Sequence, residues 1–223
     1  MAEPFTEDVK LKCLLWSDRH CCLCEKACGT DIEIAHIDEK EKGGNNIDNA
    51  IPLCYECHAK IGRYRSEHPK GNKYRPKELK ARREQIYERH TLHLVPPIEL
   101  QVTQRLIHSQ RRRMLPDVGF NLIHHGDSHP VKVRVEAKVK LGDKDLGMLG
   151  GHYGGEKLWN LNPRYIVFGH RRLPKEVVES DERLEIDVTI TIIDEYEREH
   201  KLLPMGYVYV RDGNYWFAEP SVT

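Results

Sequence analysis

The cysteines are the feature that most constrains this chain. All seven lie in the first 57 of its 223 residues. Four of them form two Cys-x-x-Cys pairs about 30 residues apart, Cys21 with Cys24 and Cys54 with Cys57. Two such pairs offer four thiolates that can close tetrahedrally around one zinc ion. We therefore predict a structural zinc site, with Cys22 or Cys28 as alternatives to one of these ligands.

The N-terminal sequence favours zinc over disulfides. The first residues, MAEPFTEDVKLK, lack the apolar stretch of a secretory leader, and no apolar run reaches the length of a membrane span. We expect a cytoplasmic protein without a membrane segment, and cysteines in that compartment stay reduced. A bound metal would also supply folding free energy to a segment with few large apolar residues.

The pattern of apolar residues divides the chain near Pro96-Pro97, into 1–97 and 98–223. In the first part, residues 5–19 predict a helix capped by Thr6, and residues 75–94 predict a second one. In the second part, residues 131–141 and 182–196 alternate apolar and polar side chains, as half-buried strands do. Residues 118–126, 165–170 and 199–220 predict further strands. We expect an α+β protein whose second domain is an antiparallel β-sandwich.

A glycine-rich segment interrupts these strands. Residues 142–155 carry six glycines but lack the Gly-Lys-Ser/Thr of a phosphate-binding P-loop. We predict a mobile loop there.

The segments WSDRHCCLC, IEIAHI and NNIDNAIPLCYECHAKI, within residues 14–62, resemble the HNH endonucleases. That family has a ββα-metal fold of two short strands and a helix that hold one divalent ion. The resemblance implies a metal-dependent nuclease that hydrolyses phosphodiester bonds. It makes His36 the general base, Asn49 the residue that orients the loop and the base, and His58 a ligand of a catalytic Mg²⁺, Mn²⁺ or Ni²⁺.

One position departs from the family pattern. Relatives commonly place Asp or His directly before the general-base histidine, where this chain has Ala35. A methyl group cannot bind a metal ion, so Glu33 or Asp38 is a candidate replacement, or waters complete the coordination of magnesium. The alternative is a catalytically inactive zinc module that binds nucleic acid or a protein.

The basic residues after His58 suggest a polyanionic partner. Residues 60–89 contain eleven Lys or Arg against four Glu, although the whole chain has formal charge +0. Such a tract binds phosphates without reading bases, so we expect DNA cleavage with little sequence specificity. RNA stays open as a substrate. The expected DNA ligands are Lys60, Arg63, Arg65, Lys73, Arg75, Lys80, Arg82 and Arg83.

A nuclease with weak sequence preference endangers its own genome. We therefore expect the second domain to hold the enzyme back, or to recognise a regulatory protein or a trigger ligand. This organisation is similar to that of bacterial phage-defence (antiviral) effectors. One site per chain would cut both strands through a homodimer or through two successive nicks.

Overall fold

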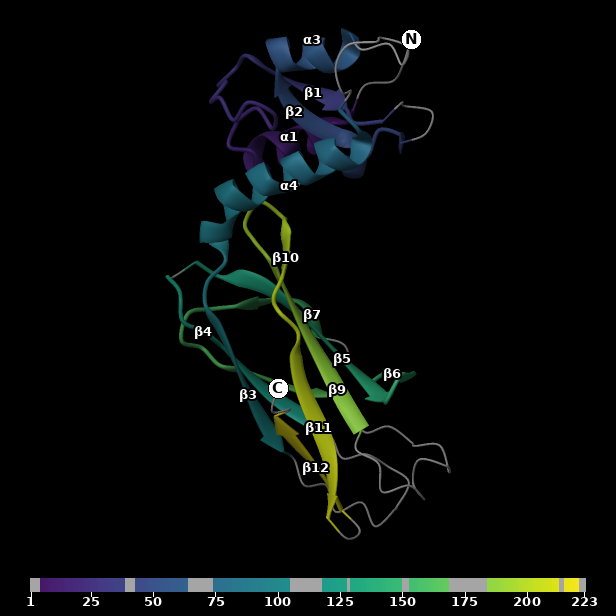
Figure 1. Cartoon of the computed structure of the whole chain (residues 1–223). Coiled ribbons are helices and arrows are strands. Elements are labelled where there is room, and N and C mark those ends of the chain that lie inside the picture. The colour runs from purple at the N-terminus through teal and green to yellow at the C-terminus, as the bar shows by residue number, and fades with distance from the viewer. Residues whose placement is uncertain are drawn as a thin grey trace. The chain divides into compact units, whose positions relative to one another are not determined.

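The computed structural model describes residues 5–38, 43–63, 74–104, 118–127, 129–149, 153–168, 184–212 and 215–220. Within these residues the protein is α+β, with three α-helices and antiparallel sheets (Figure 1). The chain divides into two compact units, residues 1–94 with Tyr196–Arg198 and residues 95–195 with 199–223. Along the chain, the boundary between the two units lies after Leu94, three residues before the predicted boundary.

The first unit contains the predicted helices. Thr6 caps α1 (Glu7–Trp16), because its Oγ1 accepts a hydrogen bond from the Val9 N–H at 3.3 Å. Helix α4 (Pro76–Thr91) begins with a proline in its first turn, where no backbone donor is lost, and continues into a 3₁₀ turn, η2 (Leu92–Leu94). Both helices lie within the predicted ranges.

Two strands and a helix follow one another in the middle of this unit. Strand β1 (Ile32–His36) pairs antiparallel with β2 (Ala50–Cys54), and a 3₁₀ turn, η1 (Ile47–Asn49), leads into β2. Helix α3 (Tyr55–Arg63) begins at the residue after β2. All five residues of β2 are buried. This hairpin therefore forms the core on which the side chains of the candidate site are placed.

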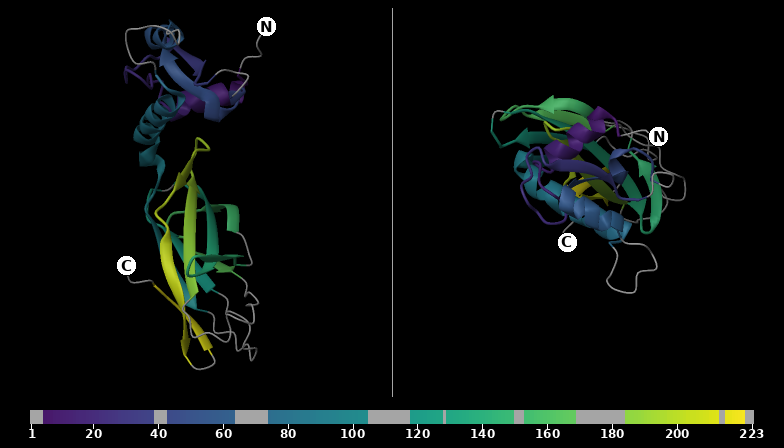
Figure 2. Two further views of the ribbon diagram at one scale, coloured as in Figure 1. Left: turned by 45° about the vertical axis from the view of Figure 1, so that its right-hand side comes forward. Right: turned by 90° about the horizontal axis from the view of Figure 1, so that it is seen from above.

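The second unit consists of two antiparallel sheets (Figure 2). One has the order β12-β11-β9-β5-β6, with β10 on β9 and β7 on β5, and the other has the order β3-β4-β8. The bounds of the strands are β3 (Ile98–Gln104), β4 (Val118–His124), β5 (Val131–Leu141), β6 (Lys144–Met148), β7 (Tyr153–Leu158), β8 (Arg164–Phe168), β9 (Leu184–Ile193), β10 (Glu199–Lys201), β11 (Met205–Asp212) and β12 (Tyr215–Pro220).

The two sheets share one hydrophobic core, as in a sandwich. Phe120 and Leu122 of β4 belong to the same buried cluster as the inward side chains of β5 and β9. Along β5 every second residue from Val131 to Val139 is buried, which matches the alternation in the sequence. Strands β5 and β9 pair from Lys132 with Ile193 to Lys140 with Glu185.

The prediction of a mobile loop at the glycine-rich segment was wrong in part. Residues 144–148 and 153–158 form β6 and β7, and both pair with β5. Irregular register at Val139/Lys140 and between Val133 and Val135 accompanies these pairings. No helix in the described ranges combines the length and apolar character that crossing a membrane requires.

Candidate functional site

Four cysteines come together as the sequence predicts. The Sγ atoms of Cys21, Cys24, Cys54 and Cys57 lie within 4.8 Å of one another. The Cys24 and Cys54 sulfurs are 3.8 Å apart. Zinc–sulfur bonds of 2.3 Å in a tetrahedron place sulfurs about 3.8 Å apart, so the cluster has the dimensions of a four-thiolate zinc site. Four thiolates fill a tetrahedral ion completely, and such a site is structural.

Two tight turns create this cluster. In the first, Cys21 N–H donates to the Lys26 carbonyl and Glu25 N–H donates to the Cys21 carbonyl, both at 2.9 Å, while Glu25 adopts φ 61°. In the second, Cys54 ends β2 and Cys57 lies in the first turn of α3, where its N–H points to the Cys54 Sγ at 3.5 Å. Both turns hold their two sulfurs toward one point.

The electrostatics of these thiols suit a metal ion. Burial acts to raise the pKa of Cys21, but hydrogen bonds from the backbone of Cys24, Cys54 and Leu23 outweigh it and lower that pKa. Burial raises the pKa of Cys24 and Cys57. A bound cation opposes this effect because it stabilises the thiolate.

The two alternative ligands, Cys22 and Cys28, lie outside the four-sulfur cluster. Cys22 is buried in the core, and Cys28 Sγ donates to the Lys26 carbonyl.

His36 ends β1 and is held on two sides. Its ring stacks on Phe5 with centroids 4.1 Å apart, and its Nε2 lies 2.9 Å from the Oδ1 of Asn45. An amide oxygen only accepts hydrogen bonds, so Nε2 carries the proton and donates it. The lone pair of the neutral imidazole is therefore on Nδ1. The sequence alone did not predict the contact of His36 with Asn45, and the asparagine pair in the Gly-Gly-Asn-Asn segment of residues 43–46 was its only signal.

Asn49 ties the loop before β2 to the end of β1. Its side chain is almost completely buried. Its Oδ1 accepts from Asp38 N–H at 2.8 Å, and its Nδ2 donates to the carbonyls of Asp38 at 3.2 Å and Gly44 at 2.9 Å. The Asn49 carbonyl also accepts from Ile37 N–H at 2.8 Å. Asn49 thus orients the loop that carries Asn45, the hydrogen-bonding partner of His36.

His58 pairs with the acid that was the candidate replacement for the missing ligand. Nδ1 of His58 in α3 lies 2.5 Å from Oε2 of Glu33 in β1, and both side chains are more than 40% exposed. Ala35 is buried, on the same side of the strand as Glu33. Asp38, the other candidate, contributes backbone groups to Asn49. Among the described residues, His36, Glu33 and His58 do not form a three-ligand cluster.

Arg83 is not exposed in the way that was expected of a DNA ligand. Its side chain is buried, and Nη1 donates to the carbonyls of Ile47 at 2.8 Å and Ala50 at 3.0 Å. Helix geometry turns it toward the core, on the same face as the buried Leu79 and Ile86. It therefore supports the loop at the start of β2.

The other predicted DNA ligands divide into two groups. Lys60, Arg75, Lys80 and Arg82 are exposed. Arg65, Lys73 and the side chain of Arg63 lie outside the described residues. The structure thus leaves four described cations of this set accessible to a partner.

Comparisons with known proteins add little to this geometry. No family model matches the chain, and no curated protein does. Among solved structures, the crystal structure of the "Putative ApaA Protein" from Bordetella pertussis is similar with a TM-score of 0.38 and 13% identity, over 52% of this chain and 94% of that one. A likeness at this level indicates no function for this chain.

Proposed function

We propose that the first unit is an HNH-type endonuclease that hydrolyses DNA phosphodiester bonds with little sequence specificity. The observation that carries this proposal is the fixed imidazole of His36, whose Nε2 is bonded to Asn45 so that the Nδ1 lone pair can accept a proton. The order strand, strand, helix, with a four-cysteine cluster beside it, supports the same assignment.

His36 would act as the general base. A neutral imidazole accepts a proton from water at neutral pH, and a hydrogen bond at the opposite nitrogen keeps the ring from rotating. The Asn45 oxygen also stabilises the imidazolium that forms, because it accepts from the N–H that becomes more acidic. Phe5 restricts the ring further through the stack at 4.1 Å.

Glu33 and His58 are the residues that would hold a catalytic divalent ion. Their Nδ1 and Oε2 atoms are 2.5 Å apart, a direct contact that a bound ion would replace. A carboxylate and an imidazole suit Mg²⁺ or Mn²⁺ with waters completing the shell, and Ni²⁺ through the imidazole. When bound, the ion would stabilise negative charge on the phosphate and on the departing oxygen. Glu33 would then take the place of the ligand that Ala35 cannot provide.

The exposed cations would position the DNA backbone. Lys60 lies on α3, two residues after His58, and Lys80 and Arg82 lie on α4. Such side chains contact phosphates rather than base edges, which gives affinity that falls steeply with salt and differs little between sequences. RNA presents the same phosphates and remains the alternative substrate.

A plasmid-nicking assay tests the proposal. Full-length protein is incubated with supercoiled plasmid and Mg²⁺, Mn²⁺ or Ni²⁺, beside His36→Ala. His129→Ala is the control, because the His129 side chain is 78% exposed in the second unit. We expect metal-dependent nicking that is lost in His36→Ala and kept in the control. Equal nicking by wild type and His36→Ala would contradict the proposal.

The buried Ala35 favours one rival function, a zinc module that binds nucleic acid or a protein without cutting. DNA binding without cleavage under any of the three ions would select this rival.

In the enzyme, the second unit would restrain or recruit the nuclease, as in a phage-defence effector, and a homodimer would allow both strands to be cut. Double-strand breaks that depend on the square of protein concentration would support the dimer.

A further inference from the structure

The first unit contains a second group of metal-binding side chains, separate from the four cysteines. Asp18, His20 and His90 offer ligand atoms that all lie within 4.8 Å of one another. Asp18 follows α1 and His90 lies in the last turn of α4. The three side chains therefore join two helices that are about 70 residues apart in sequence.

The distances in this cluster fit a shared ion better than direct hydrogen bonds. Oδ2 of Asp18 is 3.8 Å from Nδ1 of His90. This separation is too long for a hydrogen bond. Two ligand atoms bound to one tetrahedral ion at about 2.1 Å lie roughly 3.4 Å apart. A small rotation of the His90 imidazole would close the remaining difference.

Hydrogen bonds to the backbone hold the His20 imidazole in the tautomer that a metal ion requires. Nδ1 of His20 lies 2.7 Å from the Asp18 carbonyl and 3.2 Å from the Ser17 carbonyl. Carbonyl oxygens only accept, so Nδ1 carries the proton and the lone pair is on Nε2. Metal-binding histidines commonly donate their other N–H to a backbone carbonyl in this way.

The backbone around Asp18 holds an unusual conformation. Asp18 and Arg19 adopt φ values of 45° and 52°, in the left-handed region that is uncommon for non-glycine residues and that Asp tolerates better than most. This turn presents the Asp18 carboxylate to His90. The two imidazoles also stack on each other, with centroids 4.2 Å apart, and their side chains are only 23% and 20% exposed.

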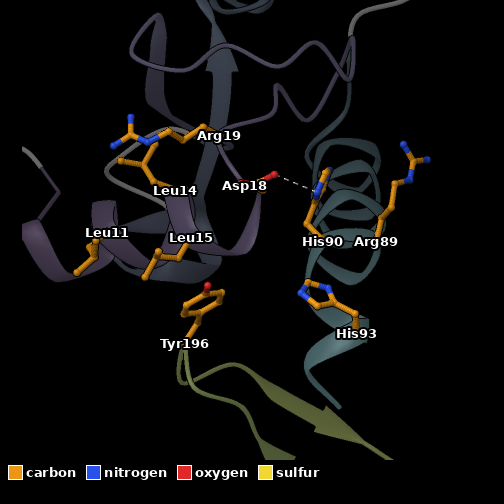
Figure 3. Close-up of a pocket in the computed structure, with 9 residues that line it drawn as sticks. All are labelled: Leu11, Leu14, Leu15, Asp18, Arg19, Arg89, His90, His93 and Tyr196. Atoms are coloured by element: carbon orange, nitrogen blue, oxygen red, sulfur yellow. Dashed lines mark ion pairs between the residues drawn. The ribbon is translucent and has the colours of Figure 1, made fainter. Parts of the chain in front are cut away.

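The cluster borders a pocket of about 380 Å³. Figure 3 shows the Asp18 carboxylate and the His90 imidazole facing each other at this pocket, with His93 near them. Leu11, Leu15 and Arg89 complete part of its wall. A small ligand or water can thus reach the cluster, which leaves room for an ion with an open coordination position.

We propose that Asp18, His20 and His90 bind a second divalent cation of the zinc class, Zn²⁺, Co²⁺ or Ni²⁺. Two imidazoles and one carboxylate are a common ligand set for these ions, and three protein ligands leave one tetrahedral position open. The ion fastens the end of α1 to the end of α4 and stabilises the first unit, because only the folded chain brings its ligands together. This site stands independently of nuclease activity.

Cobalt titration of the full-length protein tests the site. Protein whose four cysteines are already filled with zinc is titrated with Co²⁺, and bound metal is counted after gel filtration. Zinc holds thiolates more tightly than cobalt, so Co²⁺ does not displace it. The new ion is expected to show weak visible bands without sulfur-to-cobalt charge transfer, because its ligands are nitrogen and oxygen.

Two variants and one control complete the design. Asp18→Asn retains a residue that tolerates positive φ but removes the charge, and His90→Gln removes an imidazole. His93→Gln is the matched control, since His93 lines the pocket outside the ligand cluster.

We expect one zinc per wild-type chain and per His93→Gln chain, and at least one cobalt in addition, since Glu33 and His58 can hold a further ion. Cobalt affinity should fall at least about tenfold in Asp18→Asn and His90→Gln, while zinc content and circular dichroism stay unchanged. A wild-type protein that retains only the zinc ion, or cobalt binding that both variants keep, would overturn the proposal. Asp18 is 73% exposed, so Asp18→Asn decides the case if His90→Gln fails to fold.

Discussion

Neighbouring arginines in α4 should have opposite roles, which gives a sharp test of the structure. Arg83 is buried and bonded to the loop before β2, whereas Arg82 is exposed. We compare Arg83→Met with Arg82→Met. Methionine keeps most of the apolar stem of arginine and removes the charge, so both variants lose the same group in different surroundings.

The expected cost at Arg83 follows from its hydrogen bonds. The guanidinium donates to the carbonyls of Ile47 at 2.8 Å and Ala50 at 3.0 Å. Each bond from a charged donor contributes about 1.5–3 kcal/mol, and the variant leaves both carbonyls without it. The ion pair with Glu84 adds little, because the Glu84 side chain is 52% exposed. We expect Arg83→Met to lower the free energy of unfolding of the first unit by about 3–6 kcal/mol.

Urea unfolding followed by far-ultraviolet circular dichroism measures this effect. The α-helices of the described residues all lie in the first unit, so the helical signal reports that unit separately from the sheets. Arg82→Met should change the unfolding free energy by less than about 0.5 kcal/mol, and should weaken DNA binding with a salt slope smaller by about 1. Equal stability of the two variants would refute the structural role of Arg83.

Three further predictions concern the site. Removing zinc with a strong chelator, or Cys57→Ser, should unfold the first unit and leave the β-sheet transition in place, as circular dichroism will show, because an ion bound by the four clustered sulfurs supplies folding free energy. Asn45→Ala should reduce the nicking rate about 10- to 100-fold with little change in DNA binding, because His36 loses the partner of its Nε2; Asn46→Ala is the control. Glu33→Gln should raise the Mg²⁺ concentration needed for nicking, and an unchanged requirement would contradict its role as a ligand.

Elements with strong local signals could be predicted from the sequence. The Thr6 cap, the alternation along β5 and the two Cys-x-x-Cys pairs each depend on neighbours within a few residues. Strands β6 and β7 escaped prediction because their glycines suppress the apolar alternation. The edge of β5 opposite β9 stabilises them through strand pairing that the local sequence does not encode.

In the site, too, local features could be predicted and contacts across loops could not. The cysteine spacing predicts the four-sulfur cluster because each Cys-x-x-Cys pair lies in one local turn. Asn45 was missed because it reaches His36 across a loop, and the sequence gives no register for that approach. Arg83 was misassigned because charge was counted along the chain, although successive residues of a helix point about 100° apart. The periodicity that places Leu79 and Ile86 in the core places Arg83 beside them.

The loop between β1 and β2 is where these contacts converge, and Gly43→Ala tests whether it acts as one unit. A methyl group at Gly43 would lie 2.4–2.6 Å from the carboxamide of Asn49. This carboxamide cannot move freely, because it is buried and makes three hydrogen bonds to the backbone. Gly43→Ala should therefore break them, at about 1 kcal/mol each, and should lower the nicking rate by displacing Asn45 from His36.

A double-mutant cycle with Asn49→Ala distinguishes this cause from a general effect of alanine in the loop. If the clash with Asn49 is the reason for the loss, shortening that side chain removes the clash. The double variant should then have the same unfolding free energy as Asn49→Ala alone or a higher one, and its nicking rate should be no lower. Additive losses would show that Gly43 is required for another reason, and that the close approach to Asn49 does not determine how His36 is held.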